Sequence, residues 1–314
     1  MPGFILQRLL ATAPLLVIVS LLVFSLVLLI PGDPAYMLAG EDATPEEIAE
    51  IRTDMGLDDP ILVQYGRWAG GLLRGDMGTS LFSDQPVLEV LVQRLPVTLS
   101  LAFAAIVIAL LIALPAGIVS GTRPGRFSDR AITVGASAGL AIPNFWLGLM
   151  LVLVFAIWND WLPATGYIPL TESVQGWLRH ILLPAFTLGL SAGAILTRQL
   201  RGAMVDVMNQ DYIRSARAKG LPWRKVVLKH GLKNAAIPIV TILGLQANYL
   251  LGGTVIVEQV FGMPGLGQLA VASVFSRDLP MIQGVVIMAV FVAVAVNLLV
   301  DISYGYFNPK VRPQ

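Results

Sequence analysis

The sequence has 314 residues, of which 56% are hydrophobic and only 13% charged, whereas soluble domains carry roughly 25% charged residues. With a mean hydropathy of +0.75, this composition excludes an ordinary soluble domain and predicts an integral membrane protein. The chain has no cysteine and only two histidines, so we expect neither a disulfide nor a metal site. The net charge of +1 gives no reason to expect nucleic-acid binding.

Six apolar segments are long enough to cross a membrane as helices, which takes about 20 residues each. They are Leu9–Leu29, Val97–Val119, Ala131–Ile157, Ile181–Leu200, Ala235–Val257 and Met281–Tyr304. Of the 21 Lys and Arg residues, 15 fall on one side of these segments, including every lysine, and 6 fall on the other. The positive-inside rule therefore places both termini in the cytoplasm. The predicted fold is all-α, with six transmembrane helices.

The first apolar segment predicts a retained transmembrane helix within residues 1–30, because it is longer than the ~7–15 apolar residues of a signal peptide. Residues 31–96 then form an external loop with short helices of its own. Thr44 begins a capping box, and Asp59 and Asp84 mark two further helix starts, each with a proline close behind. The acidic composition of this loop is typical of a solvated face, and contact with a soluble partner is the alternative.

The core transmembrane region, residues 97–304, contains the most basic interval of the chain at 206–234, and a cytoplasmic tail of residues 305–314 follows it. Gly220 suits the left-handed position just past a helix end, and Pro222 suits the first turn of a new helix. The interval therefore predicts a helix, a sharp turn and a second helix. It either touches anionic lipid, as basic loops commonly do, or docks another protein, which the rigid turn favours.

Motifs for chemistry within the chain are weak or absent. Gly135–Gly139 matches the G-x-S-x-G pattern of serine hydrolases, but an apolar helix without a histidine favours helix packing over catalysis. No Gly-Lys pair exists for a P-loop, and the middles of the six segments hold no ionisable relay. We therefore expect no catalytic residue and an energy source in another subunit. Residues that could line a pathway or gate, or whose amides could instead hydrogen-bond between helices, are Pro143, Asn144, Gln246, Asn248 and Gln283.

Seven short motifs occur in order along the chain. They are Ile30–Pro34, Leu57–Pro60, Gly75–Ser80, Ile142–Trp146, Asp211–Leu221, Phe261–Gly267 and Asn297–Asp301. In order and spacing, this set resembles the permease subunits of type I ABC importers, in the dipeptide, oligopeptide and nickel family. The resemblance covers the whole chain and implies the type I permease fold in the bacterial cytoplasmic (inner) membrane. A secondary transporter or channel that acts alone is the alternative class.

The resemblance implies that the basic interval is the EAA loop, which couples such a permease to its ATPase. The residues implied in coupling are Arg214, Ser215, Ala216, Arg217, Ala218, Lys219, Gly220 and Leu221. Only Ala216, Gly220 and Leu232 match the general EAA consensus, whereas the version typical of peptide importers, A-R-A-K-G-L, is present in full. Residues that resemble a contact with the substrate-binding protein, or else form a plain turn, are Glu258, Phe261, Pro264 and Gly265.

The same resemblance implies the partners of the chain. These are a second homologous permease, two ABC ATPase subunits, an extracytoplasmic substrate-binding protein and membrane lipid, without nucleic acid; a homodimer is the alternative to the second permease. ATP and Mg would be bound by the ATPase subunits, which leaves no cofactor in this chain. The inferred substrate is a di- or oligopeptide, with nickel, glutathione and opines as alternatives.

Overall fold

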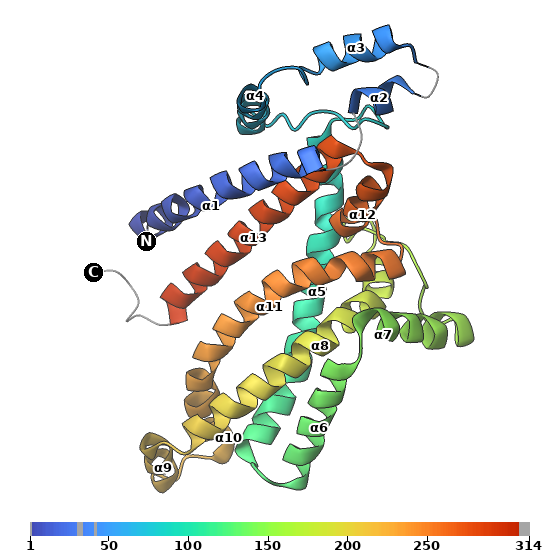
Figure 1. Cartoon of the computed structure of the whole chain (residues 1–314). Helices are drawn as coiled ribbons and strands as arrows, with labels where there is room; N and C mark the ends of the chain where they lie inside the picture. Colours follow the sequence, from blue (N-terminus) through green and yellow to red (C-terminus); the bar gives the residue numbers. More distant parts are fainter. Residues whose placement is uncertain (1, 30–33, 41–42, 308–314) are drawn as a thin grey trace. The chain divides into compact units, whose positions relative to one another are not determined.

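The computed structural model of the chain describes residues 2–29, 34–40 and 43–307 (Figure 1). These residues are mostly helical, and the described part of the chain contains no strand beyond an isolated bridge between Thr79 and Pro86. The prediction of an all-α fold is therefore confirmed. Residues 30–33 of the first motif and residues 308–314 of the predicted tail lie outside the described residues.

Four helical stretches among the described residues are each long and apolar enough to cross a membrane. They are α5 (Val87–Thr122), α8 (Val174–Met208), Pro238–Val260 within α11 (Lys233–Val260) and Leu279–Val300 within α13 (Leu279–Phe307). A fifth span arises if the bent pair α6 and α7 is counted as one. Shorter apolar helices are Thr12–Ser25 within α1 (Pro2–Leu29) and α12 (Leu266–Ser276). The number of six spans and the cytoplasmic location of the termini stay predictions.

The third predicted span, Ala131–Ile157, is broken instead of continuous. α6 (Phe127–Ala141) meets α7 (Asn144–Leu151), which continues as the π-helical η1 (Val152–Trp158), at an angle of 97°. The break falls at Pro143, which lacks the N–H that a continuing helix would need. The residue before Pro143 has extended backbone (φ −80°, ψ 121°), as the steric effect of a following proline favours.

Contacts divide the chain into two compact units, and the first comprises Met1–Leu95 and Leu269–Val294. Besides α1, its helices include α2 (Pro34–Ala39), α3 (Pro45–Asp54) and α4 (Ile61–Leu73). Thr44 forms the predicted capping box of α3: its N–H donates to Glu47 Oε2 at 2.8 Å, and its hydroxyl accepts from the Glu47 N–H at 3.4 Å. The hydrogen bonds from Thr44 lower the pKa of the exposed Glu47 carboxyl.

α4 packs on α1 through aromatic rings. The ring centroids of Tyr65 and Trp68, both on α4, lie 5.5 and 5.8 Å from that of Phe24 on α1. The third short helix predicted in the external loop, after Asp84, does not exist as a separate element. It is the beginning of α5, which starts at Val87 and continues without a break into the membrane span.

The second unit comprises the rest of the chain, and within it α5 and α8 approach each other closely at glycines. A Cβ added at Gly121 would lie 2.5 Å from Met204 Cβ, and one added at Gly189 would lie 2.8 Å from the carbonyl oxygen of Ala105. Going from Ala105 to Gly121 along α5, the contact on α8 moves from Gly189 to Met204. The two helices therefore run parallel. Their C-terminal ends therefore lie on the same side of the unit, which is the side of the basic interval.

Candidate functional site

The basic interval 206–234 folds as predicted, into a helix, a sharp turn and a second helix. α9 (Asp211–Ala218) ends before Gly220, whose φ of +71° is the left-handed conformation that glycine adopts readily. After the turn, α10 (Trp223–Lys225) begins and continues through the π-helical η2 (Val226–Leu232) into α11. We call residues 211–232 the coupling segment, after the role that the sequence predicts for them.

The residues predicted to couple the chain to an ATPase lie mainly on the surface of this segment. Those that are exposed are Arg214, Ser215, Arg217, Ala218, Lys219 and Gly220. Ala216 is buried beside Ile213 on the inner face of α9, and Leu221 is half-buried. The segment therefore presents a positively charged outer surface on an apolar base.

One cation–π contact joins the two helices of the coupling segment across the turn. The Arg217 guanidinium lies 4.6 Å from the centroid of the Trp223 ring. Arg214 pairs with Asp211 at 3.3 Å, but the two side chains are 75% and 94% exposed, so this pair adds little stability. The geometry of the turn is thus set by the glycine conformation and the Arg217–Trp223 contact.

The coupling segment is anchored on the C-terminal end of α8. The buried face of α9 belongs to the same apolar cluster as Met204 and Met208 of α8. A Cβ added at Gly231 of η2 would lie 3.1 Å from Met208 Sδ and 3.3 Å from Met204 Cε. Met204 also fills the space beside Gly121 of α5. The coupling segment is therefore packed directly on α8, and Met204 contacts α5 in turn.

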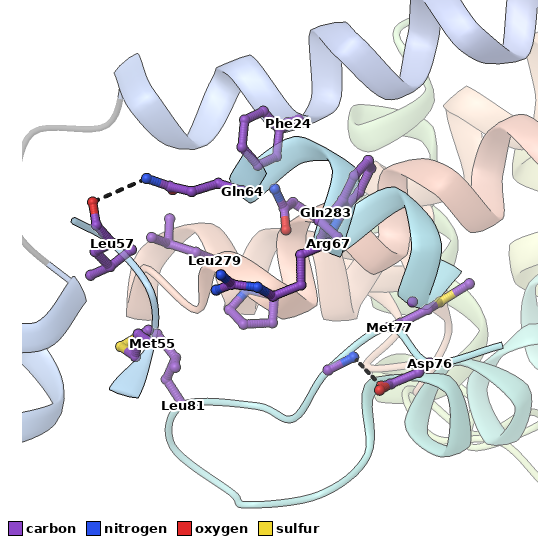
Figure 2. A pocket seen from close by; sticks show the side chains of 14 residues that line it. Phe24, Met55, Leu57, Gln64, Arg67, Asp76, Met77, Leu81, Leu279 and Gln283 are labelled. Atoms are coloured by element: carbon purple, nitrogen blue, oxygen red, sulfur yellow. Dashed lines mark hydrogen bonds between the residues drawn. The ribbon is translucent and has the colours of Figure 1, made fainter. Parts of the chain in front are cut away.

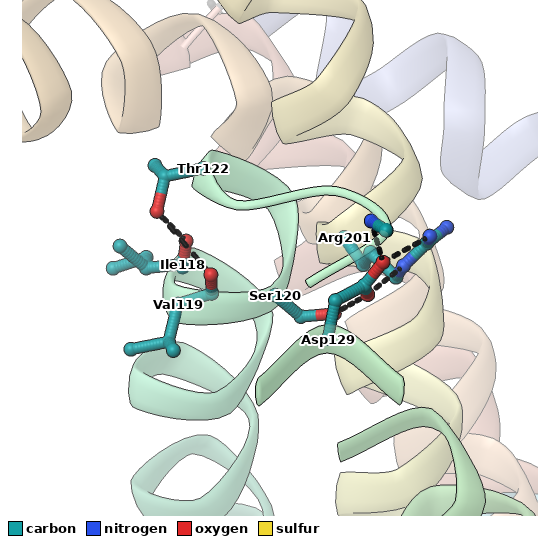
Figure 3. Close-up of polar contacts among 7 residues, drawn as sticks. Ile118, Val119, Ser120, Thr122, Asp129 and Arg201 are labelled. Atoms are coloured by element: carbon teal, nitrogen blue, oxygen red, sulfur yellow. Dashed lines mark hydrogen bonds and ion pairs between the residues drawn. The ribbon is translucent and has the colours of Figure 1, made fainter. Parts of the chain in front are cut away.

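A buried ion pair ties the turn between α5 and α6 to α8 (Figure 3). The Asp129 carboxylate, 3% exposed, accepts hydrogen bonds from Arg201 Nε at 2.5 Å and Nη2 at 2.8 Å. The Ser120 hydroxyl of α5 and the backbone N–H of Gly125, the latter at 2.7 Å, donate to the same carboxylate. These donors satisfy a charge that would be costly to bury alone.

Sequence reasoning missed the pairing of Asp129 with Arg201. The available signal was one acidic residue in the otherwise basic turn at 123–130, which joins two apolar helices. An acid in that position indicates a nearby cation, but the cation is 72 residues away along the chain. The identity of that cation follows only from the packing of α6 against α8.

The residues predicted to line a pathway are distributed over both compact units. Those at the break between α6 and α7 are Pro143 and Asn144. Gln246 and Asn248 lie on α11, and Asn248 Nδ2 donates to Asn297 Oδ1 of α13 at 2.7 Å. Within the described residues, Gln246 Oε1 and Asn248 Oδ1 are buried without a hydrogen-bond partner. The fifth residue, Gln283, belongs to the first compact unit and lines a cavity there.

The segment that follows α11 packs around a buried carboxylate, that of Glu258. Glu258 is 0% exposed. Its Oε1 accepts a hydrogen bond from the Thr98 hydroxyl at 2.8 Å, and its Oε2 accepts one from the backbone N–H of Gln268 at 2.9 Å. Phe261 is also buried, and Gly265 lies against Glu258. Burial of Glu258 and Phe261 argues against the predicted contact of these two side chains with another protein. For the half-buried Pro264 and for Gly265, which is buried as well, such a contact stays a prediction.

Comparison with known families identifies the class of protein that this architecture represents. Residues 113–313 match the family described as binding-protein-dependent transport system inner membrane component. Residues 1–102 match the N-terminal part of a membrane component of such systems. The chain therefore belongs to this family, the permeases of type I ABC importers. It is a multi-pass transport subunit of the inner membrane.

Individual relatives agree with this assignment. The chain is 40% identical over 312 residues to a putative peptide transport system permease protein of Brucella abortus, with 99% of each chain covered. It is 42% identical over 312 residues to the glutathione transport system permease protein GsiC of Salmonella paratyphi A, again with 99% of each covered. Its fold resembles a chain of the inward-facing methionine ABC transporter MetNI, with a TM-score of 0.57 and 19% identity over 70% of this chain and 97% of the other. The predicted permease fold is confirmed.

Proposed function

We propose that the chain forms half of the translocation pathway of an ATP-driven importer of di- and oligopeptides, and that ATPase subunits act on its coupling segment. One observation carries this proposal: the segment is exposed and basic on its outer side and packed on α8 on its inner side. A loop that only touched anionic lipid would need neither the left-handed Gly220 nor the buried face of α9.

The substrate class is inferred from the relatives. The chain is similar over nearly its full length to permeases named for peptide transport and for glutathione transport. Glutathione is itself a short peptide, so both names share one ligand chemistry. We take di- and oligopeptides as the substrate and glutathione as the second candidate.

The proposed cycle is alternating access. Two partner ATPase subunits bind ATP and Mg, and their closure displaces the coupling segment. The displacement passes to α8, and from α8 to α5 and α6 through Met204 and the Arg201–Asp129 pair. The pathway then opens outward to a docked substrate-binding protein, and hydrolysis resets it. A second homologous permease supplies the other half of the pathway.

Co-purification tests this assignment. The tagged chain, isolated from its native membrane, should bring ATPase subunits and a second permease with it. Gly220→Pro should lose the ATPase subunits, because proline cannot adopt a φ of +71°. Gly40→Pro is the matched control: Gly40 has a φ of +85° in the predicted external loop, so this variant should keep the ATPase subunits.

Uptake into proteoliposomes completes the test. The reconstituted transporter should accumulate a dipeptide only when ATP and the substrate-binding protein are both present. A chain that purifies alone and still moves solute without ATP would contradict the proposal. That outcome would instead favour a transporter or channel that acts by itself.

A further inference from the structure

A cavity of about 310 Å³ lies in the first compact unit, among the external segment, α1 and the beginning of α13 (Figure 2). Much of its wall is apolar and includes Phe24, Trp68, Met77 and Leu279. Small-molecule sites have volumes of about 300–1,000 Å³ and combine apolar walls with a few polar groups. The cavity therefore has the size and composition of a site for a small ligand.

Gln283 places an unpaired amide in this cavity. The residue is only 9% exposed, and its side-chain amide forms no hydrogen bond to any of the residues that the structure describes. The amide atoms are not fully enclosed, and the cavity that Gln283 lines is the space to which they are open. A glutamine amide both donates and accepts, so it matches a peptide group, which also does both.

Two opposite charges line the same cavity. Asp76 Oδ1 accepts the Gly78 N–H at 2.9 Å, which leaves its second oxygen without a partner in the described part of the chain. Arg67 donates from Nη2 to Asp59, a bond that uses one of the five donors of a guanidinium group. An ammonium group pairs with a carboxylate such as Asp76, and a carboxylate pairs with an arginine such as Arg67.

We propose that this cavity binds a short free peptide on the outer side of the transporter, before the peptide enters the pathway. Gln283 pairs with a main-chain amide, Asp76 with the α-ammonium group and Arg67 with the terminal carboxylate. The apolar walls accept a side chain, and the volume suits about two residues. The site rests on the proposed function, which makes peptides the transported class. The pairing of Arg67 with Asp59 reduces its free charge and makes the site a weak one.

Peptide binding without the binding protein tests the site. The complete transporter in nanodiscs is equilibrated with radiolabelled Ala-Leu, and bound peptide is measured by dialysis. Gln283→Leu should weaken binding about tenfold, the loss expected for a hydrogen bond to a buried amide. Gln93→Leu, at an exposed glutamine of α5 outside the cavity, should bind as the unmodified chain does.

A second variant, Asp76→Asn, tests the site through charge and stays informative if Gln283→Leu misfolds. The unmodified chain should bind N-acetyl-Ala-Leu about tenfold more weakly than Ala-Leu, since acetylation removes the ammonium group. Asp76 is exposed, and Asp76→Asn keeps an oxygen for the Gly78 N–H, so this variant should fold and should lose the difference between the two peptides.

Three results would overturn the site. The first is no binding of Ala-Leu to the unmodified transporter, and the second is unchanged peptide binding in both Gln283→Leu and Asp76→Asn. The third is a Gln283→Leu variant that still binds the peptide but no longer docks the binding protein. The last result would mean that the cavity holds a segment of the binding protein. ATP-driven uptake is measured in parallel, so uptake without dipeptide binding would refute this site and leave the proposed function standing.

Discussion

Replacement of Arg201 by methionine is the sharpest test of the buried ion pair at the turn between α5 and α6. Methionine keeps much of the apolar stem but removes both hydrogen bonds to Asp129. Breaking a buried pair costs about 3–5 kcal/mol when the remaining charge stays buried. The Asp129 side chain is 3% exposed, but Arg201 is 36% exposed, so water can reach the vacated side. We therefore expect a loss of about 2–3 kcal/mol.

The reverse change, Asp129→Asn, should cost only about 1–2 kcal/mol, because water can solvate the Arg201 that remains. The double variant should be more stable than Arg201→Met alone, since it buries no unpaired charge. Denaturant unfolding of the purified chain in detergent, followed by tryptophan fluorescence, gives the three free energies. A loss in Arg201→Met no larger than that in Asp129→Asn, or simple additivity in the double variant, would refute the reasoning.

Two further substitutions probe the packing of the second unit. Gly121→Ala should destabilise the chain by about 1–3 kcal/mol, because the new methyl would lie 2.5 Å from Met204 Cβ, whereas Gly202→Ala meets no atom within 4 Å. Equal unfolding free energies for these two variants would contradict the close approach of α5 and α8. Thr98→Val should cost about 1–3 kcal/mol and speed amide exchange after α11, since it removes the hydrogen bond to the buried Glu258. Unchanged exchange there would show that this bond does not hold the segment after α11 in place.

Hydropathy and helix-breaking residues were sufficient to predict most helices. Proline, however, breaks a helix at some positions and not at others. Pro96 and Pro115 lie within the continuous α5, whereas Pro143 ends one helix and begins another. Neighbouring helices decide whether the carbonyl that a proline frees is satisfied, and the spacing of the sequence does not contain that information. The start of α5 at Val87 was missed for a related reason, since a short helix and the beginning of a long one look alike locally.

In the candidate site, features made by residues adjacent in sequence could be predicted, whereas contacts between residues far apart in sequence could not. The turn at Gly220 was predictable, because the residues that create it are adjacent in sequence. The pairs Asp129–Arg201 and Thr98–Glu258 join residues 72 and 160 positions apart. Their partners depend on which helices are neighbours and in which direction they run. The burial of Glu258 likewise depends on the fold of the segment after α11, so its position past an apolar helix did not reveal it.

Single-cysteine cross-linking measures whether the coupling segment contacts an ATPase subunit. The chain has no cysteine, so Ser215→Cys on the exposed side of α9 introduces a single thiol in this subunit. Ser83→Cys, exposed in the predicted external loop, is the matched control. We expect a cross-link from position 215 to an ATPase subunit, with a yield that changes when ATP binds, and none from position 83. No cross-link from position 215 in a transporter that retains its ATPase subunits would contradict this expectation.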